Sequence, residues 1–397
     1  MNKASKIIFA VVLVAALVFG IAFGAMTLKN RILTEEVNAL KASAGESRKL
    51  TEVRRLLDKV FIGEIDEDYM TECLCNAMVQ GIDDEWSYYI SAEDYAAYYE
   101  NVTNSYVGIG VTIRQMEETD PGFTIVEISP DSPAEKAGLK PGDMIVAVGG
   151  ESAAELGMEE TKNRVRGEEG TQVQITFRID GEDRELSLTR AKVKSVNITY
   201  EMLEDNIGYI HIRNFEQNCA NDTIAAIEDL QAQGMQGLVF DLRFNPGGMK
   251  NELVDLLDYL LPEGIIFHSE SYTGKEEFDR SDARHLDLPM SVLVNVDSYS
   301  AAEFFAAAMQ EYDAATIVGT QTYGKGYFQQ CFRLDDGSAV NVSTGKYYTP
   351  DGDSLAGVGI TPDKVIELSD EDYLAVYYGT MEHADDAQLQ EAINAVR

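Results

Sequence analysis

The side chains of this chain that could do chemistry gather at two strand-to-helix junctions and at one lysine between two glycines. The first junction spans residues 237–248, where a strand rich in apolar residues runs into Asn-Pro-Gly-Gly before a helix. Glycine permits close backbone approach, and the first amides of a helix lack partners within it, so this turn suits an anion or an oxyanion. A plain tight turn is the alternative. A phosphate loop is excluded, because no Gly-Lys-Ser/Thr follows the glycines.

The second junction, residues 293–303, places Ser298 and Ser300 where a helix begins. A serine there commonly caps the helix with its hydroxyl. It could instead be a nucleophile whose developing negative charge lies near free amide N–H groups. The esterase motif Gly-x-Ser-x-Gly is absent, and no histidine is close in sequence, so a base must come from elsewhere.

Lys325 is a candidate base, because it lies between two glycines and is followed by aromatic residues. A lysine accepts a proton near neutral pH only if desolvation lowers its pKa from about 10.4 toward 7–8. An ordinary solvated loop lysine is the alternative. The segment Ser343-Thr-Gly-Lys346 matches Ser-x-x-Lys, but its companion motifs are missing, and we expect it on a strand.

Three stretches of different hydrophobic periodicity must position these side chains. Residues 27–100 are predicted to be helical and end in the aromatic run 86–89, which we interpret as core packing. Residues 101–191 show short alternating strands, the first at Val107–Ile113, and one short helix at 132–139. Residues 192–370 alternate strands with amphipathic helices, which is typical of an α/β domain with a largely parallel sheet. The strands expected there are 208–212, 237–242, 291–296 and 316–319, and the helices are 218–233, 249–261 and 300–312.

The N-terminus predicts a membrane anchor. Residues 7–26 carry no charged side chain, and a helix of that length spans a hydrocarbon core of about 30 Å. Lys3 and Lys6 favour a cytoplasmic location for residues 1–6, which leaves the acidic body outside the cytoplasm. A cleaved signal peptide, and hence a secreted protein, is the alternative.

Charge and composition exclude several classes of function. The chain has 397 residues and a net charge of −36, and nucleic-acid binding requires a basic face instead. Its 4 cysteines and 4 histidines show no metal-binding spacing, so we expect no metal site. A serine nucleophile with a lysine base would require no metal or organic cofactor. The histidines are His211, His268, His285 and His383.

At these residues the sequence resembles the C-terminal processing peptidases, serine proteases of peptidase family S41 that contain an inserted PDZ domain. The resemblance runs in order from about residue 50 to the C-terminus. Its motifs fall in residues 81–91, 106–111, 132–143, 166–171, 241–248, 298–303, 322–329 and 347–352. It implies an α/β protease core with a mostly parallel sheet (192–370), an inserted β-rich PDZ-like domain (101–191) and flanking helical segments (27–100 and 371–397). The transmembrane helix predicted at residues 7–26 would precede them.

The resemblance also assigns roles to residues. In this family the nucleophile is the middle serine of Ser-Ala-Ser-Ala-Ser-Glu, which here is Ser300. Lys325 would be the base, and Gln329 would hold its amine. The sequence departs from the family pattern at Asp297, Tyr299 and Ala302. Those departures bear on substrate fit and rate more than on catalysis itself.

Further roles follow for backbone groups. The amide of Ala301 and that of Gly247 or Gly248 would meet the oxyanion. The PDZ-like domain would hold the carboxylate of a substrate C-terminus near Gly108, Ile109 and Gly110.

The expected function is therefore a membrane-anchored serine endopeptidase that recognises protein or peptide substrates through free C-termini and forms an acyl-enzyme. The alternatives are a catalytically silent PDZ scaffold and a different α/β hydrolase acting on small esters. Amphipathic helices at residues 30–80 and 371–397 indicate a homodimer, as the resemblance implies, unless both ends pack on their own protease domain.

Overall fold

The computed structural model describes residues 48–397 except 103–104, 117–119 and 195. The chain divides into two compact units, Met1–Cys73 and Leu74–Arg397. The predicted anchor at residues 7–26 lies outside the described residues. Among the helices that are described, none has the length and apolar character needed to cross a membrane.

The first unit contributes a helix at residues 48–60 and the beginning of α2 (Glu67–Gln80). Within this unit Arg54 joins the two helices, because its guanidinium donates to Asp58 at 2.7 Å and also to the carboxylate of Glu67. The helical periodicity predicted for this region is confirmed where it is described.

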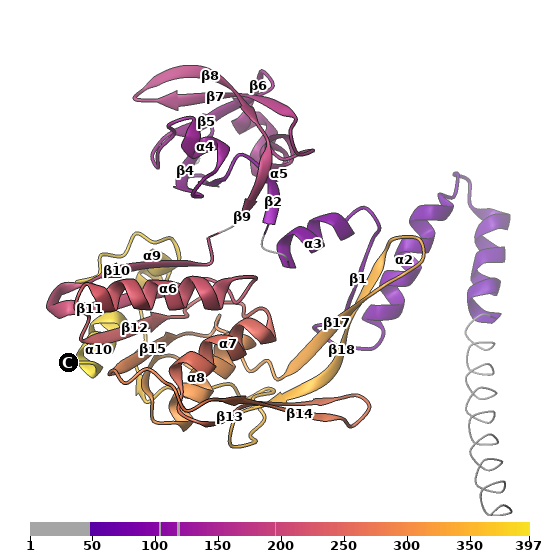
Figure 1. Cartoon of the computed structure of the whole chain (residues 1–397). Coiled ribbons are helices and arrows are strands. Elements are labelled where there is room, and N and C mark those ends of the chain that lie inside the picture. The colour runs from indigo at the N-terminus through magenta and orange to yellow at the C-terminus, as the bar shows by residue number, and fades with distance from the viewer. Residues whose placement is uncertain (1–47, 103–104, 117–119, 195) are drawn as a thin grey trace, which may run out of the picture. The chain divides into compact units, whose positions relative to one another are not determined.

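A six-stranded sheet forms the centre of the second unit, in the order β10-β11-β12-β15-β16-β19. All neighbours in it are parallel except β10 and β11, so the predicted parallel sheet is confirmed. Its strands are β10 (Ile198–Met202), β11 (Ile207–Ile212), β12 (Gly237–Asp241), β15 (Met290–Val294), β16 (Ala315–Gly319) and β19 (Lys364–Val365). Helices α6 (Cys219–Ala232), α7 (Lys250–Leu260) and α8 (Ala301–Glu311) follow β11, β12 and β15 (Figure 1).

Both faces of this sheet are buried, which explains why its strands read as continuous apolar runs. Phe240 and Val292 point to the face that packs with α6, α7 and α8. Their neighbours Val239 and Leu293 point to the other face, where α10 (Ala387–Ala395) packs through Leu389. Leu389 and most of its partners are completely buried.

Helix α10 therefore packs on its own protease domain, which the sequence analysis left open as the alternative for residues 371–397. Helix α9 (Asp370–Tyr377) buries none of its residues, although the rings of Tyr373 and Tyr377 contact the ring of Phe244. Leu374, Tyr377 and the adjacent Tyr378 are 49%, 55% and 46% exposed.

An antiparallel sheet that the sequence analysis did not predict adjoins this core. It is built from β1 (Tyr88–Ile90), β13 (Gly264–Ser271), β14 (Glu276–Ser281), β17 (Tyr327–Arg333) and β18 (Ala339–Tyr348). The segment 343–346 lies on β18, as expected. Because β1 pairs with β18, residues 88–90 belong to this sheet, and the assignment of all of 27–100 to a helical region is wrong there.

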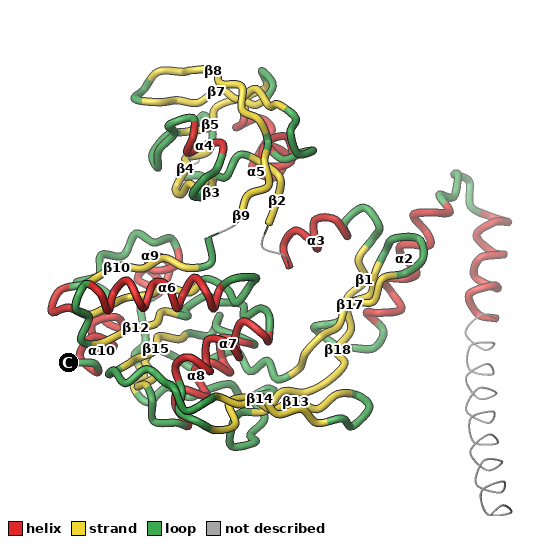
Figure 2. The backbone as a smooth tube through the Cα atoms, viewed as in Figure 1, coloured by secondary structure: helices red, strands yellow, loops and turns green. Residues whose placement is uncertain are grey.

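The β-rich module at 101–191 is confirmed, with a core of its own that includes Phe123, Ile145 and Phe177. Figure 2 shows its strands in yellow. They are β2 (Ser105–Gly108), β3 (Val111–Arg114), β4 (Phe123–Ile128), β5 (Met144–Val148), β6 (Glu151–Ser152), β7 (Gln172–Ile179), β8 (Glu182–Thr189) and β9 (Ala191–Lys194). Its helices are α4 (Pro133–Lys136) and α5 (Ala153–Val165), and α3 (Tyr95–Val102) precedes the module.

Two predictions in this module need correction. The strand expected at 107–113 is split into β2 and β3. The break lies at Gly110, where φ is +82° and a Cβ atom would lie 2.2 Å from that of Ser132. Helix α5 was not predicted, and its helical pattern is interrupted at Gly157, which has φ +77°.

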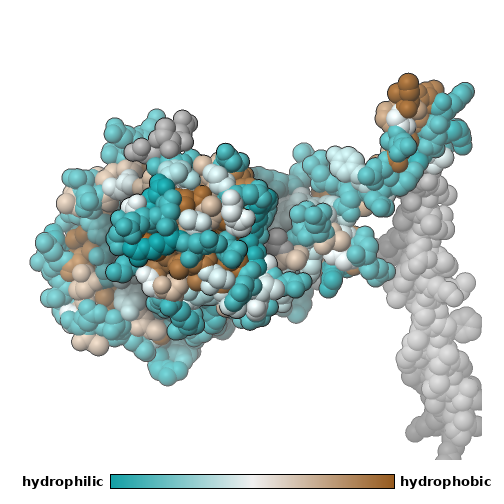
Figure 3. All heavy atoms as spheres, turned by 90° about the horizontal axis from the view of Figure 1, so that it is seen from above, coloured by the Kyte–Doolittle hydropathy of each residue, from teal (hydrophilic) through white to brown (hydrophobic). Residues whose placement is uncertain are grey.

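Hydrophilic side chains cover most of the face seen in Figure 3, and apolar ones appear there in small patches. That surface agrees with a chain that carries 68 acidic and 32 basic residues.

Candidate active site

Ser300 lies at the strand-to-helix junction that the sequence singled out, immediately before the first residue of α8. It is 8% exposed and has φ +58° and ψ −125°, outside the regions that a serine normally occupies. Such a backbone costs on the order of 1–3 kcal/mol and persists only where its surroundings enforce it. No described residue accepts a hydrogen bond from the N–H of Ala301, the first residue of α8.

The structure distinguishes Ser300 from Ser298. The Ser298 hydroxyl is fully buried, donates to the carbonyl of Leu242 at 2.7 Å and accepts from the Asn295 N–H at 2.9 Å. The side chain of Asn295 also accepts from the N–H of Phe244. Ser298 is therefore a structural link between the two junctions and is not free to act as a nucleophile.

The glycine turn lies directly against Ser300. A Cβ atom on Gly247 would lie 2.7 Å from the Ser300 Cβ and 2.8 Å from the Ala301 nitrogen. Asn245 fixes this approach, since its carbonyl accepts from the Tyr299 N–H at 3.1 Å and its side-chain oxygen from the Gly247 N–H at 2.8 Å. Of the two glycine amides predicted for the oxyanion, that of Gly247 is thus occupied. The Gly248 N–H donates to no group in the described part of the chain.

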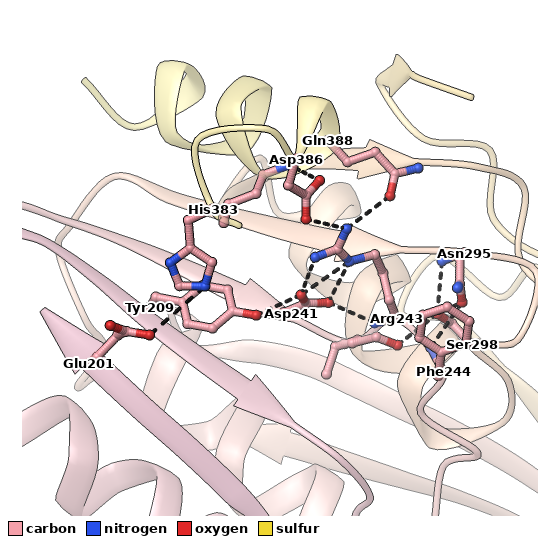
Figure 4. Close-up of polar contacts among 12 residues, drawn as sticks. Glu201, Tyr209, Asp241, Arg243, Phe244, Asn295, Ser298, His383, Asp386 and Gln388 are labelled. Atoms are coloured by element: carbon pink, nitrogen blue, oxygen red, sulfur yellow. Dashed lines mark hydrogen bonds and ion pairs between the residues drawn. The ribbon is translucent and has the colours of Figure 1, made fainter. Parts of the chain in front are cut away.

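A buried ion-pair network holds the strand end that leads into this turn (Figure 4). Arg243 is 3% exposed and donates to Asp241 at 2.6 Å and to Asp386 at 2.8 Å. Burial alone would raise the pKa of Asp241, but the Arg243 guanidinium lowers it to about 2. Two further hydrogen bonds complete the network: the Gln388 side chain accepts from Arg243 at 3.2 Å, and the Tyr209 hydroxyl donates to Asp241 at 2.8 Å. The network attaches the beginning of α10 to the segment that contains Gly247.

Lys325 lies in the segment that joins β16 to β17 and is half-buried. The chain requires glycine at position 326, because a Cβ on Gly326 would lie 2.6 Å from the backbone nitrogen of Ala356. Burial lowers the pKa of the Lys325 amine to about 8, although the charges of Asp84, Glu303 and Glu85 oppose that shift. The desolvation that the base role requires is therefore present.

The amine of Lys325 lies over the ring of Trp86, 4.0 Å from its centroid. Trp86 also contacts the rings of Tyr299 and Tyr323, at 5.9 and 5.5 Å between centroids. The interpretation of Trp86 as ordinary core packing is therefore wrong, since its face meets the candidate base. In the described part of the chain no hydrogen bond joins the amine to the Ser300 hydroxyl.

Gln329 lies on β17, but its amide donates to the Ser343 hydroxyl at 3.0 Å and to the Tyr327 carbonyl at 3.3 Å. Among the described residues no hydrogen bond connects it to the Lys325 amine. The Ser343 N–H in turn donates to the Ser87 hydroxyl at 3.0 Å. The role expected for Gln329 stays a prediction.

Ile109 and Gly110 line a pocket together with Tyr106, Lys162 and Arg166 of the β-rich module, and Asn214, Glu216 and Pro246 of the protease core line it too. Gly108 ends β2 and does not line it. The guanidinium of Arg166 lies 5.0 Å from the centroid of the Tyr106 ring. Two of the three residues expected to hold a C-terminal carboxylate thus lie at a pocket with basic side chains.

One residue of the site escaped the sequence analysis. Glu303 is completely buried, and its carboxylate accepts hydrogen bonds from the N–H groups of both Ser300 and Lys325. The pattern Ser-x-x-Glu at the start of a helix was the available signal, because a glutamate at that spacing commonly reaches back to the capping residue.

Comparison with known proteins agrees with this geometry. Residues 206–366 match the model of peptidase family S41, and residues 124–179 match that of the PDZ domain. The carboxy-terminal processing protease CtpA of Bacillus subtilis is 32% identical over 375 residues, which cover 93% of this chain and 79% of the relative. The chain belongs to peptidase family S41. The resemblance seen in the sequence is thereby confirmed.

One further relative and one solved structure are similar to this chain. A CtpA-like serine protease of Staphylococcus epidermidis is 31% identical over 327 residues, and the match spans 81% of this chain and 66% of that protein. The crystal structure of an S41 protease from Bacteroides fragilis has a TM-score of 0.53 at 19% identity, covering 80% of this chain and 89% of the other. That likeness concerns the fold.

We predict that Gly247→Ala lowers hydrolytic activity at least about 100-fold, because the new Cβ displaces Ser300 and the Ala301 amide. The matched control is Gly234→Ala, since Gly234 has a similar φ of +95° but no atom within 4 Å of the added Cβ. The control should keep kcat/KM within about 2-fold and lose only about 1–2 kcal/mol of stability. Equal activity of the two variants would show that close approach at Gly247 is unimportant.

Proposed function

We propose that this S41 family member is a serine endopeptidase that cleaves proteins recognised through their C-terminal tails, with Ser300 as nucleophile and Lys325 as base. One observation carries the proposal: a strained, buried serine at a helix N-terminus shares its anchoring carboxylate with a desolvated lysine whose pKa is about 8.

In the first step the neutral amine of Lys325 accepts the proton of the Ser300 hydroxyl while Oγ attacks the scissile carbonyl carbon. The negative charge on the carbonyl oxygen is stabilised by the amides of Ala301 and Gly248, which have no other partner among the described residues. The Lys325 ammonium then gives its proton to the leaving amine as the C–N bond breaks. Water hydrolyses the acyl-enzyme, with Lys325 again taking a proton.

Trp86 affects the first step, because an aromatic face attracts the ammonium form of lysine and not the neutral amine. Loss of the proton therefore weakens the contact with Trp86 and frees the amine to approach Ser300. The side-chain amide of Gln329 would hold the amine there after it exchanges its hydrogen bond to the Ser343 hydroxyl for one to Lys325.

The PDZ module supports recognition of a substrate C-terminus. Extended peptides bind such modules by adding a strand, with the terminal carboxylate held by backbone amides. Ile109 and Gly110 line a pocket with Lys162 and Arg166, whose positive charges favour a carboxylate, whereas Glu216 at the same pocket opposes one.

We also propose that residues 7–26 anchor the protein in the cell membrane, with the catalytic domain outside the cytoplasm. The apolar run and the two lysines before it support this location. The N-terminal sequence of the protein recovered from membranes tests the anchor. A secreted chain that begins after the apolar run would contradict it.

The exposed apolar side chains of α9 support a homodimer, which is the remaining part of the proposal. Light scattering of the detergent-solubilised chain measures its mass. A fully active monomer would rule the dimer out.

The catalytic assignment is tested by incubating the chain with an unstructured protein and identifying the fragments by mass spectrometry. Ser300→Ala and Lys325→Ala should each lower cleavage at least about 1,000-fold without unfolding the protein. Alanine variants of the four histidines serve as controls and should stay active. A histidine variant that folds but is inactive would overturn the Ser–Lys assignment.

A substrate with an amidated C-terminus should be cleaved more slowly than one with a free carboxylate.

The pKa of Lys325 predicts how activity depends on pH. Below about pH 8 the amine is an ammonium and cannot accept the Ser300 proton, so kcat/KM should rise with pH and level off above about pH 8. Initial rates from pH 6 to 9 measure this curve. A rate that is flat across the range would argue against Lys325 as the base.

A further inference from the structure

Glu303, in the first turn of α8, has no role in the chemistry described above, yet its carboxylate accepts hydrogen bonds from four groups of the site. Its Oε2 accepts from the Ser300 N–H at 3.0 Å and from the Lys325 N–H at 2.8 Å. One oxygen atom thus holds the backbone of both the nucleophile and the base, which are far apart in the sequence.

The second oxygen extends the same contact. Oε1 accepts from the Thr322 hydroxyl and from the Gly324 N–H, each at 2.6 Å. Three of the four donors therefore come from the segment 322–325, which carries the base. Because all four groups donate, the side chain accepts only, and this is the arrangement that an ionised carboxylate needs.

Burial of this charge has a cost that its hydrogen bonds offset only in part, so the pKa of Glu303 stays above its ordinary value. Glu303 is completely buried, which raises the pKa of its carboxyl, while the bonds from Thr322, Lys325, Gly324 and Ser300 lower it. A buried acid with four donors remains costly to replace by an apolar residue, because each donor would lose its partner.

The hydrogen bond from the Ser300 N–H to Glu303 lies at a strained point of the backbone. Ser300 has φ +58°, a conformation that its surroundings must enforce, and the Glu303 carboxylate holds its N–H. The neighbouring Ala301 N–H is thereby left free at the same turn, with its position set by Ser300.

We propose that Glu303 is a positioning residue of the active site, whose single carboxylate sets the distance between the nucleophile Ser300 and the base Lys325. The inference rests on the proposed Ser–Lys function. Both oxygens of Glu303 are occupied by protein donors, so it touches neither substrate nor the reacting atoms. Its negative charge also favours the ammonium that forms when Lys325 takes the proton from Ser300.

The variant Glu303→Gln tests this in the full-length chain in detergent. An amide keeps one acceptor oxygen but turns its NH₂ group toward groups that donate to the carboxylate, so at least one backbone N–H loses its acceptor. We expect kcat to fall at least about 100-fold while KM changes less than about 3-fold, since no substrate contact is lost. The pH midpoint of kcat/KM should move to lower pH, because a negative charge that stabilises the Lys325 ammonium is gone.

The matched control is Glu252→Gln. Glu252 is also a buried glutamate that accepts two backbone N–H bonds, from Asn218 at 3.1 Å and Ala220 at 3.0 Å. A purely structural role predicts the same loss of thermal stability in both variants and no change in the pH midpoint of either. If Glu303→Gln keeps the wild-type kcat and pH midpoint, or behaves like Glu252→Gln, the inference is wrong.

A second variant keeps the test decisive if Glu303→Gln does not fold. Thr322→Val removes one of the four donors and leaves the charge in place, so kcat should fall about 10-fold with an unchanged pH midpoint. Wild-type kcat in this variant would count against the inference.

The result is separable from the proposed function. Activity that survives Ser300→Ala overturns that function, whereas inactive Ser300→Ala and Lys325→Ala with a fully active Glu303→Gln overturns only the role of Glu303.

Discussion

The buried carboxylate of Glu303 is the contact on which the arrangement of the site depends. Its two oxygens collect four hydrogen bonds from Ser300, Thr322, Gly324 and Lys325. A charge without partners could not stay in this interior, so the two segments must come together for either to be stable. The same interaction that satisfies the charge therefore brings a serine and a lysine from different elements to one place.

The parallel sheet supplies the frame for that contact. Strands β12 and β15 are neighbours, so the segments that leave their carboxyl ends, one with the glycine turn and one with Ser300, lie side by side. Asn245, Asn295 and Ser298 cross-link the two segments through buried hydrogen bonds. The ion pairs of Arg243 with Asp241 and Asp386 then attach one of them to α10. A rigid support of this kind is what a strained backbone at Ser300 requires.

Lys325 experiences two opposing influences. Burial favours the neutral amine, whereas the ring of Trp86 and the nearby acidic side chains favour the ammonium. The result is a pKa of about 8, which leaves both forms accessible near neutral pH. A lysine that must accept and then release a proton in one catalytic cycle benefits from this balance.

The sequence by itself determined the parallel core, the β-rich module and the family, because hydrophobic periodicity and glycine-rich junctions are local features that a chain carries along its length. It also supplied Ser300 and Lys325 through the family motif. It left Ser298 open as a nucleophile on the residues alone, placed all of 27–100 in helices and missed Glu303 and the contact of Trp86 with the base. These were decided only by the tertiary structure. Partners that are distant in sequence decide which serine hydroxyl is already hydrogen-bonded, which glycine amide is free and which lysine is desolvated. No local pattern specifies such partners.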